Sequence, residues 1–372
     1  MQSENKRSLL RLNNITLLQF KNYRSSAFHF TERIIGICGK NGIGKTNLLD
    51  AIYYCCFTKS YFTRSDSLNV HTGNQGFRLA ATINRGEVLH EIVCILRETG
   101  RKEISVNGDG YEKFSEHIGK FPGVMIAPDD VQIITEGSEE RRRFLDALLS
   151  QLDHTYLVQL ISYNKILVQR NSLLKSFAET RRIDNSLLEV LNEQLSIPGT
   201  IIFEKRRNFL KDFIPLVKLF YQKISGEDYE VSLRYESQLL YASFESLLQQ
   251  FRDKDLVLQR THAGVHKDDL EINLRGNAFK NIASQGQRKS LLFALKLAEF
   301  EVLKNANGFP PLLLLDDLFE KLDQHRMQNL LEWVCTENNG QIFITDTHCE
   351  RLKDHLKSLN VSYQLIELNV NG

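Results

Sequence analysis

The stretch that decides the fold is RIIGICGKNGIGKTNLLDAI, residues 33–52. A largely β-branched run, 34–38, meets a glycine-rich turn, 39–44, and a helical pattern follows from Lys45. This is G-x-x-x-x-G-K-[ST] in the strand, turn and helix context that the phosphate-binding loop requires. The glycines let successive backbone amides face a phosphate, and the helix adds the positive end of its dipole. The stretch therefore predicts a nucleoside triphosphate site.

The residue types of this loop suggest individual roles. We expect Lys45 to reach the β- and γ-phosphates and Thr46 to hold Mg²⁺. The other nucleotide-binding candidates of the loop are Gly39, Lys40, Asn41, Gly42, Ile43, Gly44 and Asn47.

Length and composition limit the class of protein. A chain of 372 residues exceeds one ordinary domain and predicts two lobes. With 42% apolar and 25% charged residues, the composition is typical of a soluble globular protein. No stretch approaches the roughly 20 apolar residues of a membrane span, and the N-terminus lacks the apolar core of a signal peptide. We therefore expect a cytoplasmic protein without a membrane partner, and the net charge of +1 does not by itself indicate nucleic acid.

The cysteines are expected to be reduced thiols, most of them buried. They include no C-x-x-C pair, and their spacings match neither a zinc site nor a disulfide framework. The six positions are Cys38, Cys55, Cys56, Cys94, Cys335 and Cys349.

Hydrophobic periodicity divides the chain into an α/β part and a helical part. Residues 15–30 predict two short strands, and 77–113 alternate apolar and polar residues as in a β-meander. From 138 to 220 the pattern is helical, punctuated by Pro198-Gly199 and Pro215. Strands return near 229–235 and 269–274, a helix near 285–303 and a buried strand at 311–315. The pattern indicates one α/β lobe interrupted by a helical lobe.

A second acidic motif follows about 270 residues after the loop. PLLLLDDLFEKLD, residues 311–323, is four leucines ending in two aspartates. In P-loop ATPases such a strand lies beside the P-loop strand and places its carboxylates near the metal and the attacking water. We assign Asp316 to Mg²⁺ and Asp317 to water, so the predicted catalytic residues are Asp317, Asp316 and Lys45. The alternative is a buried strand whose acids only cap the following turn.

A third motif, ASQGQRKSLLFALKLAE at 283–299, suggests a second anion-binding helix end. Ser284 and Gly286 precede a strongly periodic helix, although serine at such a position is often only an N-cap. A single bound nucleotide needs only one anion-binding helix end, so a second one helps to tell classes of P-loop ATPase apart. Its place between the loop and the Leu-Leu-Asp-Asp strand resembles the signature motif of ABC-type ATPases.

The order of motifs resembles the ABC-type heads of the SMC family, and more closely the RecF family of bacterial recombination-mediator ATPases. The segments that carry the resemblance include LLQFKNYRS, GKNGIGKTNLLDAI, APDDVQIITEGSEERRRFLDALLSQLDHTYL, SYNKILVQRNSLLK, GVHKDDLEINL, SQGQRKSLLFALKLAE and LLLLDDLFEKLD. SMC proteins carry long coiled coils between the halves of the head. Here the intervening segment is only about 150 residues and lacks a sustained heptad.

The resemblance implies an α/β fold, an ABC-type P-loop ATPase head with an inserted, mainly helical second lobe. The expected domains are residues 1–124 and 286–372 for the ATP-binding lobe and 125–285 for the helical lobe. The residues carried over are Lys45 and Thr46 as Walker A, Asp316 and Asp317 as Walker B, Ser284, Gly286 and Gln287 as signature, and Leu322 and Asp323 as D-loop.

Two family positions depart from the pattern. ABC ATPases usually carry a glutamine on the loop that joins the two lobes. In IAPDDVQ, Pro128 stands near that position and Gln132 comes slightly after it, so no Q-loop residue is assigned. Asp346 stands where the switch histidine often lies, and His348 comes two residues later. Hydrolysis is expected to be slow if neither fits.

The resemblance implies ATP and Mg²⁺ as cofactors and a weak DNA-dependent ATPase. ATP sandwiched between two chains would favour a two-fold dimer on DNA near single-strand gaps or junctions, loading recombinase with RecR and RecO and serving the SOS response. The alternatives are a DNA-bridging protein with a vestigial ATPase and an ABC transporter subunit. A nuclease-linked protein would need a further acidic metal cluster, which the sequence does not offer.

Basic and metal-ligating side chains give two further hypotheses. The candidates for DNA contact are Lys59, Arg64, Arg141, Arg142 and Arg143, and the alternative for the trio is a solvated helix face paired with Glu139 and Glu140. THAGVHKDD holds His262, His266, Asp268 and Asp269, but it resembles a RecF segment not known for metal, so no metal is assigned there.

Overall fold

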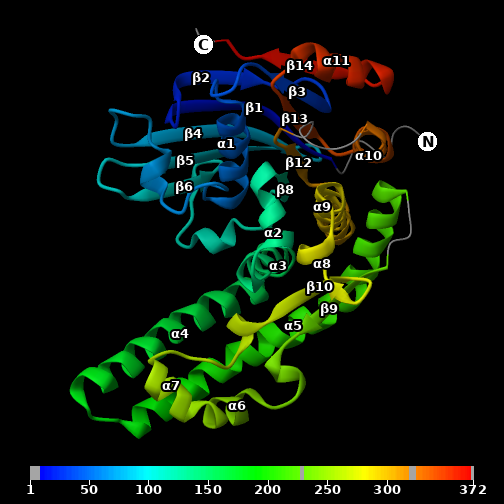
Figure 1. Ribbon diagram of the computed structural model, residues 1–372. Coiled ribbons are helices and arrows are strands. Elements are labelled where there is room, and N and C mark those ends of the chain that lie inside the picture. Colours follow the sequence, from blue (N-terminus) through cyan, green and yellow to red (C-terminus); the bar gives the residue numbers. More distant parts are fainter. Residues whose placement is uncertain (1–8, 227–229, 318–323, 370–372) are drawn as a thin grey trace. The chain divides into compact units, whose positions relative to one another are not determined.

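The computed structural model describes residues 9–226, 230–317 and 324–369. They fall into two compact units. Unit 1 lies within residues 1–130, 223–226 and 289–372, and unit 2 lies within 131–222 and 227–288. Helix α9 (Gln285–Asn307) begins in unit 2 and continues in unit 1. The predicted α/β head with an inserted helical part is confirmed (Figure 1).

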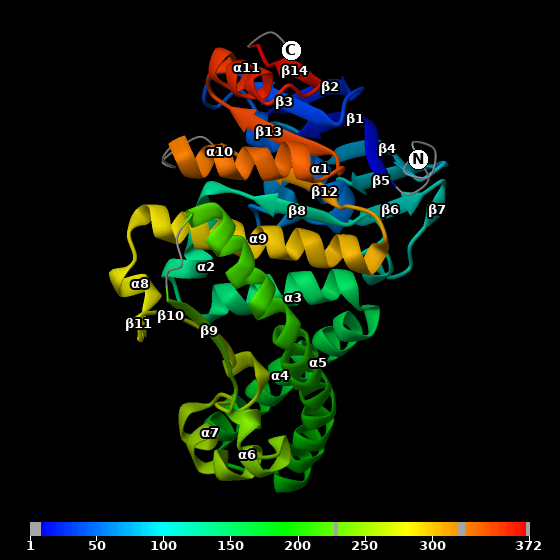
Figure 2. The same ribbon diagram turned by 90° about the vertical axis from the view of Figure 1, so that its right-hand side faces the viewer.

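The first sheet of unit 1 is parallel and has five strands in the order β14-β3-β13-β12-β8. The strands are β14 (Tyr363–Glu367), β3 (Ile34–Cys38), β13 (Ile342–Asp346), β12 (Leu312–Leu315) and β8 (Gly123–Ile126). The three central strands are buried along their whole length, as expected for a parallel sheet covered on both faces. Figure 2 shows α11 (Cys349–Ser358) near β14 and β3 at one end of this sheet.

The predicted adjacency of the Leu-Leu-Asp-Asp strand and the P-loop strand is wrong. Strand β13 lies between β3 and β12 and pairs with both. The carboxyl ends of parallel strands nevertheless meet at one edge of a sheet, so the residues after β3 and β12 still come together.

The second sheet of unit 1 has six strands in the order β2-β1-β4-β5-β6-β7. They are β2 (Tyr23–His29), β1 (Leu10–Phe20), β4 (Phe77–Arg85), β5 (Val88–Leu96), β6 (Lys102–Val106) and β7 (Asp109–Gly110). All neighbours are antiparallel, which confirms the predicted meander. Asn107 and Gly108 both have positive φ, as a tight hairpin turn requires.

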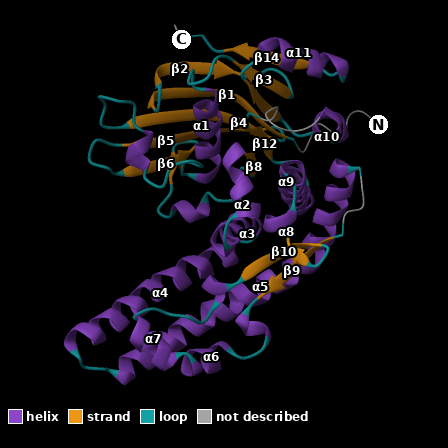
Figure 3. Ribbon diagram, in the orientation of Figure 1, coloured by secondary structure: helices purple, strands orange, loops and turns teal. Residues whose placement is uncertain are grey.

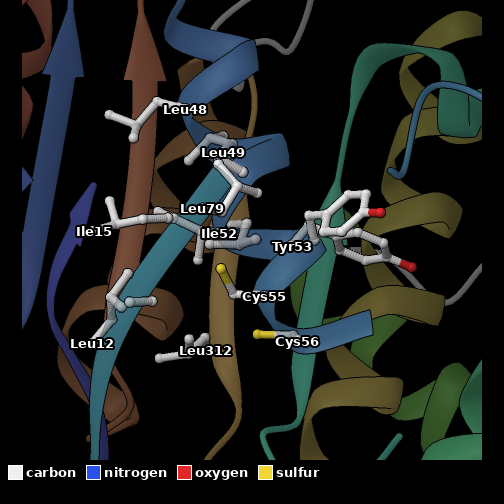
Figure 4. Packing of buried hydrophobic residues seen from close by; sticks show 14 of the residues in the cluster. Leu12, Ile15, Leu48, Leu49, Ile52, Tyr53, Cys55, Cys56, Leu79 and Leu312 are labelled. Carbon is white, nitrogen blue, oxygen red and sulfur yellow. The ribbon is translucent and has the colours of Figure 1, made fainter. Parts of the chain in front are cut away.

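Helix α1 (Lys45–Phe57) supplies much of the core of unit 1. Eleven of its thirteen residues are buried, so it has no solvated stripe. Figure 4 shows Leu48, Leu49 and Ile52 of α1 packed with leucines of both sheets, including Leu79 and Leu312. Burying a leucine or isoleucine side chain contributes about 1.5–3 kcal/mol. The helix that follows the P-loop is therefore fixed by packing along its length.

In its described residues, unit 1 also contains short elements and the helices α10 and α11, and the last residue of η3 already belongs to unit 2. They are η1 (Asp66–Asn69), η2 (Phe114–Glu116), η3 (Pro128–Val131), α10 (Gln324–Glu332), the π-helix η6 (Trp333–Glu337) and α11.

Unit 2 is mainly helical (Figure 3). Its helices are α2 (Gln132–Thr135), α3 (Ser138–Leu152), α4 (His154–Thr180), α5 (Asn185–Ser225, with its last turn in unit 1), α6 (Phe244–Gln250), α7 (Arg252–Leu258) and α8 (Phe279–Ile282), with η4 (Gln238–Leu240) and η5 (Val265–Lys267). Its antiparallel sheet has the order β11 (Asn277–Ala278), β10 (Asp269–Leu274), β9 (Val231–Glu236).

The prolines do not interrupt the helical segment as expected. Pro198 and Pro215 both lie inside α5, a single helix of 41 residues. A proline removes one helical hydrogen bond and crowds the preceding turn. Buried side chains beside both prolines, among them Leu195 and Val217, hold the helix through these positions.

Buried ion pairs order unit 2. Arg206, which is 2% exposed, donates to Asp268 (2.8 Å) and Asp146 (2.7 Å). Arg170 donates to Asp255 at 2.8 Å, and both side chains are fully buried. Removing one partner of such a pair leaves an uncompensated buried charge and costs about 3–5 kcal/mol.

The expectation that all cysteines are free thiols is wrong for two of them. Cys38 and Cys349 form a disulfide, whereas Cys55, Cys56, Cys94 and Cys335 are free and buried. The bonded residues are 311 positions apart, so no local spacing could reveal the pair. Within the described residues, no helix has both the length and the apolar character needed to cross a bilayer.

Candidate nucleotide-binding site

The phosphate-binding loop holds Lys45 in a buried position. Its side chain is 4% exposed, and its Nζ donates to the carbonyl oxygens of Gly39 (2.9 Å) and Lys40 (3.2 Å). Lys40 itself is exposed. The loop therefore fixes one of its two ammonium groups and leaves the other in solvent.

Asn22, in the turn after β1, and Tyr23, the first residue of β2, brace the loop. Asn22 Nδ2 donates to the Ile43 carbonyl at 2.8 Å, and the Tyr23 hydroxyl donates to the Gly44 carbonyl at 3.0 Å. Gly44 has φ 119°, and a Cβ there would lie 2.5 Å from Asn22 Nδ2. Asn47 Nδ2 also donates to Asn22 Oδ1 at 2.7 Å. Glycine is thus required at position 44 both by the backbone angle and by the close approach of Asn22.

Thr46 and Asp316 come together from opposite ends of the chain. The Thr46 hydroxyl lies 3.0 and 2.9 Å from the two carboxylate oxygens of Asp316. The Thr345 hydroxyl contacts Asp316 Oδ1 at 2.9 Å and accepts a 2.8 Å bond from the amide of Asp317. Burial raises the pKa of Asp316 to about 6, opposed by the Thr345 and Thr46 hydrogen bonds. Hard oxygen ligands around a buried carboxyl group are the kind of set that suits Mg²⁺.

Asp317 has an unusual backbone conformation. Its φ is 43°, in the left-handed region that few residues other than glycine adopt. Such conformations persist only where the surroundings impose them, and they cluster at functional sites. Here the Thr345 hydroxyl holds the Asp317 amide directly after the buried β12 strand.

The last residue of β13, Asp346, adds a buried acid to the same edge of the sheet. Asp346 is 1% exposed and pairs with Arg351 of α11, whose Nε lies 2.9 Å from Asp346 Oδ2. The amide of His348 donates to Asp346 Oδ1 at 3.1 Å, while His348 itself is exposed. The geometry therefore gives Asp346 a role in ordering the turn, and the identity of a switch residue stays a prediction.

The signature candidates lie at the start of α9, within unit 2. The Gln287 amide donates to Ser284 Oγ at 3.2 Å, and the Ser284 amide donates to Gln287 Oε1 at 2.8 Å. This reciprocal pair is a capping box, so the N-cap interpretation of Ser284 is confirmed. Ser284 is exposed, and its capping contact does not exclude a second partner. The D-loop candidates Leu322 and Asp323 lie outside the described residues, as does the rest of 318–323.

Comparisons with known proteins identify the family. A family model described as RecF/RecN/SMC N terminal domain matches residues 11–366. A "DNA replication and repair protein RecF" from Flavobacterium johnsoniae is 45% identical over 359 residues, which is 96% of this chain and 100% of the relative. One from Parabacteroides distasonis is 42% identical and covers 96% of this chain and 97% of its own.

The chain belongs to the RecF family.

Solved structures agree with membership in the RecF family. A structure titled "recombination mediator protein RecF-ATP in RecFOR pathway" has a TM-score of 0.85 and 30% identity, and the match covers 92% of this chain and 93% of that one. The Smc head of Pyrococcus furiosus, at TM-score 0.55 and 17% identity, shares the fold. The chain is thus a DNA replication and repair protein with an SMC-like ATPase head.

Of the basic residues considered for DNA contact, three are engaged within unit 2. Arg141 is 8% exposed and pairs with Asp269, with Nε 2.6 Å from Oδ1. Arg142 donates to the Asp268 carbonyl at 2.6 Å, and Arg143 pairs with Glu139 and Glu140. Lys59 and Arg64 are exposed on unit 1. The trio is thus engaged in contacts within unit 2, whereas Lys59 and Arg64 are exposed. DNA contact by any of the five residues stays a prediction.

The histidines and aspartates of THAGVHKDD have structural partners. His262 lies 2.9 Å from Asp255, and His266 lies 2.6 Å from the Tyr163 hydroxyl. Asp268 and Asp269 pair with the arginines described above. In the described part of the chain, no group of three or more His, Cys, Asp or Glu side chains forms a metal site.

Sequence reasoning missed the residues that support the site. Thr345 links the two acids, and Asn22 and Tyr23 hold the loop carbonyls. Their only signal in the sequence was indirect. LLQFKNYRS, which contains Asn22 and Tyr23, carried part of the resemblance to the RecF family.

Proposed function

We propose that this chain is an ATP-dependent DNA-binding protein of recombinational repair and replication-fork recovery. ATP would drive homodimerisation on DNA near single-strand gaps or junctions, and slow hydrolysis would release it. By resemblance to the RecF family, RecO and RecR would be its partners in recombinase loading, and it would serve the SOS response. Its location would be the cytoplasm. The observation that carries the proposal is the contact between Thr46 of the phosphate-binding loop and Asp316, supported by Thr345.

The roles at the site follow from these contacts. Loop amides and Lys45 would bind the phosphates, while Thr46 and Asp316 would hold Mg²⁺ with ATP. Bound Mg²⁺ neutralises charge that develops on the phosphate oxygens. Asp317 would orient the attacking water, because it follows Asp316 directly and its backbone is fixed by Thr345. A position for Asp323 across the dimer interface remains part of the proposal.

The dimer proposal predicts a change of mass in solution. Light scattering should give the mass of one chain without nucleotide and of two chains with ATP and DNA, because ATP would be bound by both partners. ADP is the control, since it lacks the γ-phosphate. Equal masses with ATP, with ADP and without nucleotide would contradict ATP-driven dimerisation. ATP turnover that rises on adding DNA would separate this function from that of a DNA-bridging protein with a vestigial ATPase.

Asp317→Asn should lower ATP turnover about a hundredfold while leaving ATP affinity within about twofold, because the amide keeps the size and loses the base. Turnover is measured by phosphate release and affinity by equilibrium dialysis. Asp253→Asn is the control, since the Asp253 side chain is 95% exposed in unit 2. If Asp317→Asn hydrolysed ATP at the wild-type rate, the role would pass to another acid, and Asp316 and Glu320 would be the next to test.

Lys59→Ala combined with Arg64→Ala should weaken DNA binding about tenfold and lower the slope of log affinity against log salt by about 2, because two phosphate contacts are lost. Fluorescence anisotropy with duplex and gapped DNA over a salt series measures both. The matched control is Arg101→Ala, which removes an arginine side chain that is 77% exposed in the same unit. An unchanged salt slope would place the DNA contacts elsewhere.

A further inference from the structure

The disulfide between Cys38 and Cys349 borders the candidate nucleotide site. Cys38 is the last residue of β3, directly before the phosphate-binding loop, and Cys349 is the first residue of α11. Their Cα atoms lie 5.2 Å apart, within the range that a disulfide spans without backbone movement. The bond therefore joins the strand that carries the loop to the segment that leaves β13.

Cys38 is the fixed end of this bond. It is fully buried and pairs with Asp346 of β13 on one side and with Glu367 of β14 on the other. Its carbonyl oxygen also accepts a 2.8 Å hydrogen bond from the amide of Leu368. Because the sheet holds Cys38 from both sides, opening or closing the disulfide acts on the Cys349 end.

The disulfide ties both ends of the short segment Thr347–His348 to the same residue, Cys38. Asp346 is the partner of Cys38 in the parallel pairing of β13 with β3, and the Asp346 carbonyl accepts a hydrogen bond from the Gly39 amide at 3.3 Å. Cys349 is bonded to the same Cys38. Only two residues separate these attachment points, so the closed bond leaves them little freedom.

Helix α11 has other anchors that do not depend on the disulfide. Leu352 and Leu356 are fully buried. Gly36 of β3 lets Leu352 approach closely, because a Cβ there would lie 2.9 Å from Leu352 Cδ2. Opening the bond should therefore leave α11 docked and free the Cys349 side of the segment 347–349, which is then held by the contacts of Asp346 with the His348 amide (3.1 Å) and with Arg351 (2.9 Å).

This segment adjoins the acids proposed for hydrolysis. It starts two residues after Thr345, whose hydroxyl contacts Asp316 at 2.9 Å and the Asp317 amide at 2.8 Å. Loop movement next to the catalytic site limits turnover in many enzymes, so restricting such a segment is expected to lower kcat.

We infer that Cys38 and Cys349 are a redox-modifiable thiol pair whose oxidation clamps the segment 347–349 and slows ATP turnover. The effect on turnover rests on the ATPase function proposed above, and the thiol chemistry does not. In the cytoplasm, where thiols are kept reduced, a disulfide is usually transient and redox-sensing. The pair would lower turnover when the thiol pool becomes oxidised and restore it on reduction.

The oxidant is a low-molecular-weight disulfide. Cys349 is partly exposed, so its thiolate attacks the small disulfide, forms a mixed disulfide and releases one small thiol. The thiolate of Cys38 then attacks the Cys349 sulfur and releases the second small thiol. Two electrons pass from the protein to the small disulfide, and the two thiol protons are taken up by the released thiols.

The test compares the full chain after glutathione disulfide and after dithiothreitol. Oxidation should lower the number of free thiols from six to four, and peptide mapping should recover the linked Cys38 and Cys349 peptides. The kcat for ATP should fall about fivefold with KM within about twofold, and dithiothreitol should restore it. Hydrogen exchange of the amides of 347–349 should slow in the oxidised form.

Cys349→Ser and Cys349→Ala should keep the turnover of the reduced wild type under both conditions. Cys94→Ala is the matched control, because it removes one of the free buried thiols and should respond as the wild type does. Absence of the linked peptide after oxidation would overturn the inference, and so would fully linked protein with unchanged kcat and unchanged exchange at 347–349. If neither form bound or hydrolysed ATP, the proposed ATPase would fail, while the peptide map and the exchange rates would still decide whether the clamp exists.

Discussion

Lys45→Ala should weaken ATP binding about a thousandfold, a loss of about 4 kcal/mol. The reason is the position of the ammonium group. It is 4% exposed and held by two loop carbonyls, so its charge acts on a bound phosphate with little screening by solvent. The loop amides and Thr46 remain in the variant, which explains why residual binding is expected. Equilibrium dialysis with ATP and Mg²⁺ measures the loss.

Lys40→Ala provides the matched control for this prediction. It removes the same chemical group from the same loop, but Lys40 is exposed and offers Lys45 only its backbone carbonyl, which alanine retains. ATP affinity should change less than about threefold, as for a solvated surface charge. Equal losses in the two variants would mean that the loop acts through its overall charge, and unchanged affinity in Lys45→Ala would refute the phosphate-binding role of the loop.

The sequence predicted the parts of the site that depend on neighbours along the chain. The turn at 39–44, the helix from Lys45 and the apolar strand before Asp316 each follow from residue types within about ten positions. The β-meander followed in the same way from alternation and turn residues. These elements need only local chemistry to specify them.

The missed features depend on pairing across the chain. The position of β13 between β3 and β12 is a matter of sheet order, which periodicity does not encode. Thr345 contacts acids 29 and 28 positions away, and the cysteines pair over 311. The prolines of α5 do not end the helix for a related reason, since tertiary packing outweighs the local preference to end a helix there.

Ser284→Arg should lower DNA-stimulated ATP hydrolysis about a thousandfold while ATP affinity stays within about threefold. By resemblance to ABC-type heads, the signature helix of one chain completes the ATP site of a second chain, so an arginine there would fill the space meant for the γ-phosphate. Ser284 is exposed, so the larger side chain has room in the single chain. Loss of the capping contact costs about 1 kcal/mol, too little to unfold the protein. Phosphate release, dialysis and light scattering measure hydrolysis, affinity and dimer formation.

Ser243→Arg is a close control because Ser243 is also an exposed N-cap in unit 2. The Ser246 amide donates to Ser243 Oγ at 3.2 Å, the same distance as between the Gln287 amide and Ser284 Oγ. Ser243→Arg should therefore lose the same capping energy and keep its turnover. A drop in ATP affinity alone in Ser284→Arg would indicate a site completed within one chain.

Mixing two inactive variants decides between a site within one chain and a site shared by two. A Ser284→Arg chain keeps its phosphate-binding loop, and a Lys45→Ala chain keeps its signature. Their heterodimer would then hold one intact composite site and one doubly damaged site. With random pairing, half of the dimers are heterodimers, so hydrolysis should recover to about a quarter of the wild-type rate if the two sites act independently. Recovery cannot occur if each chain completes its own site, because every chain in the mixture carries a damaged one.

A mixture that forms heterodimers, as shown by mass, can still fail to hydrolyse ATP. That result would mean either a site within one chain or two sites that must act together. A covalently linked dimer with a single Ser284→Arg substitution separates these two cases. After a mixture without recovery, half of the wild-type rate in that linked dimer indicates a site within one chain, because one chain is intact, whereas complete loss indicates that both shared sites must be intact.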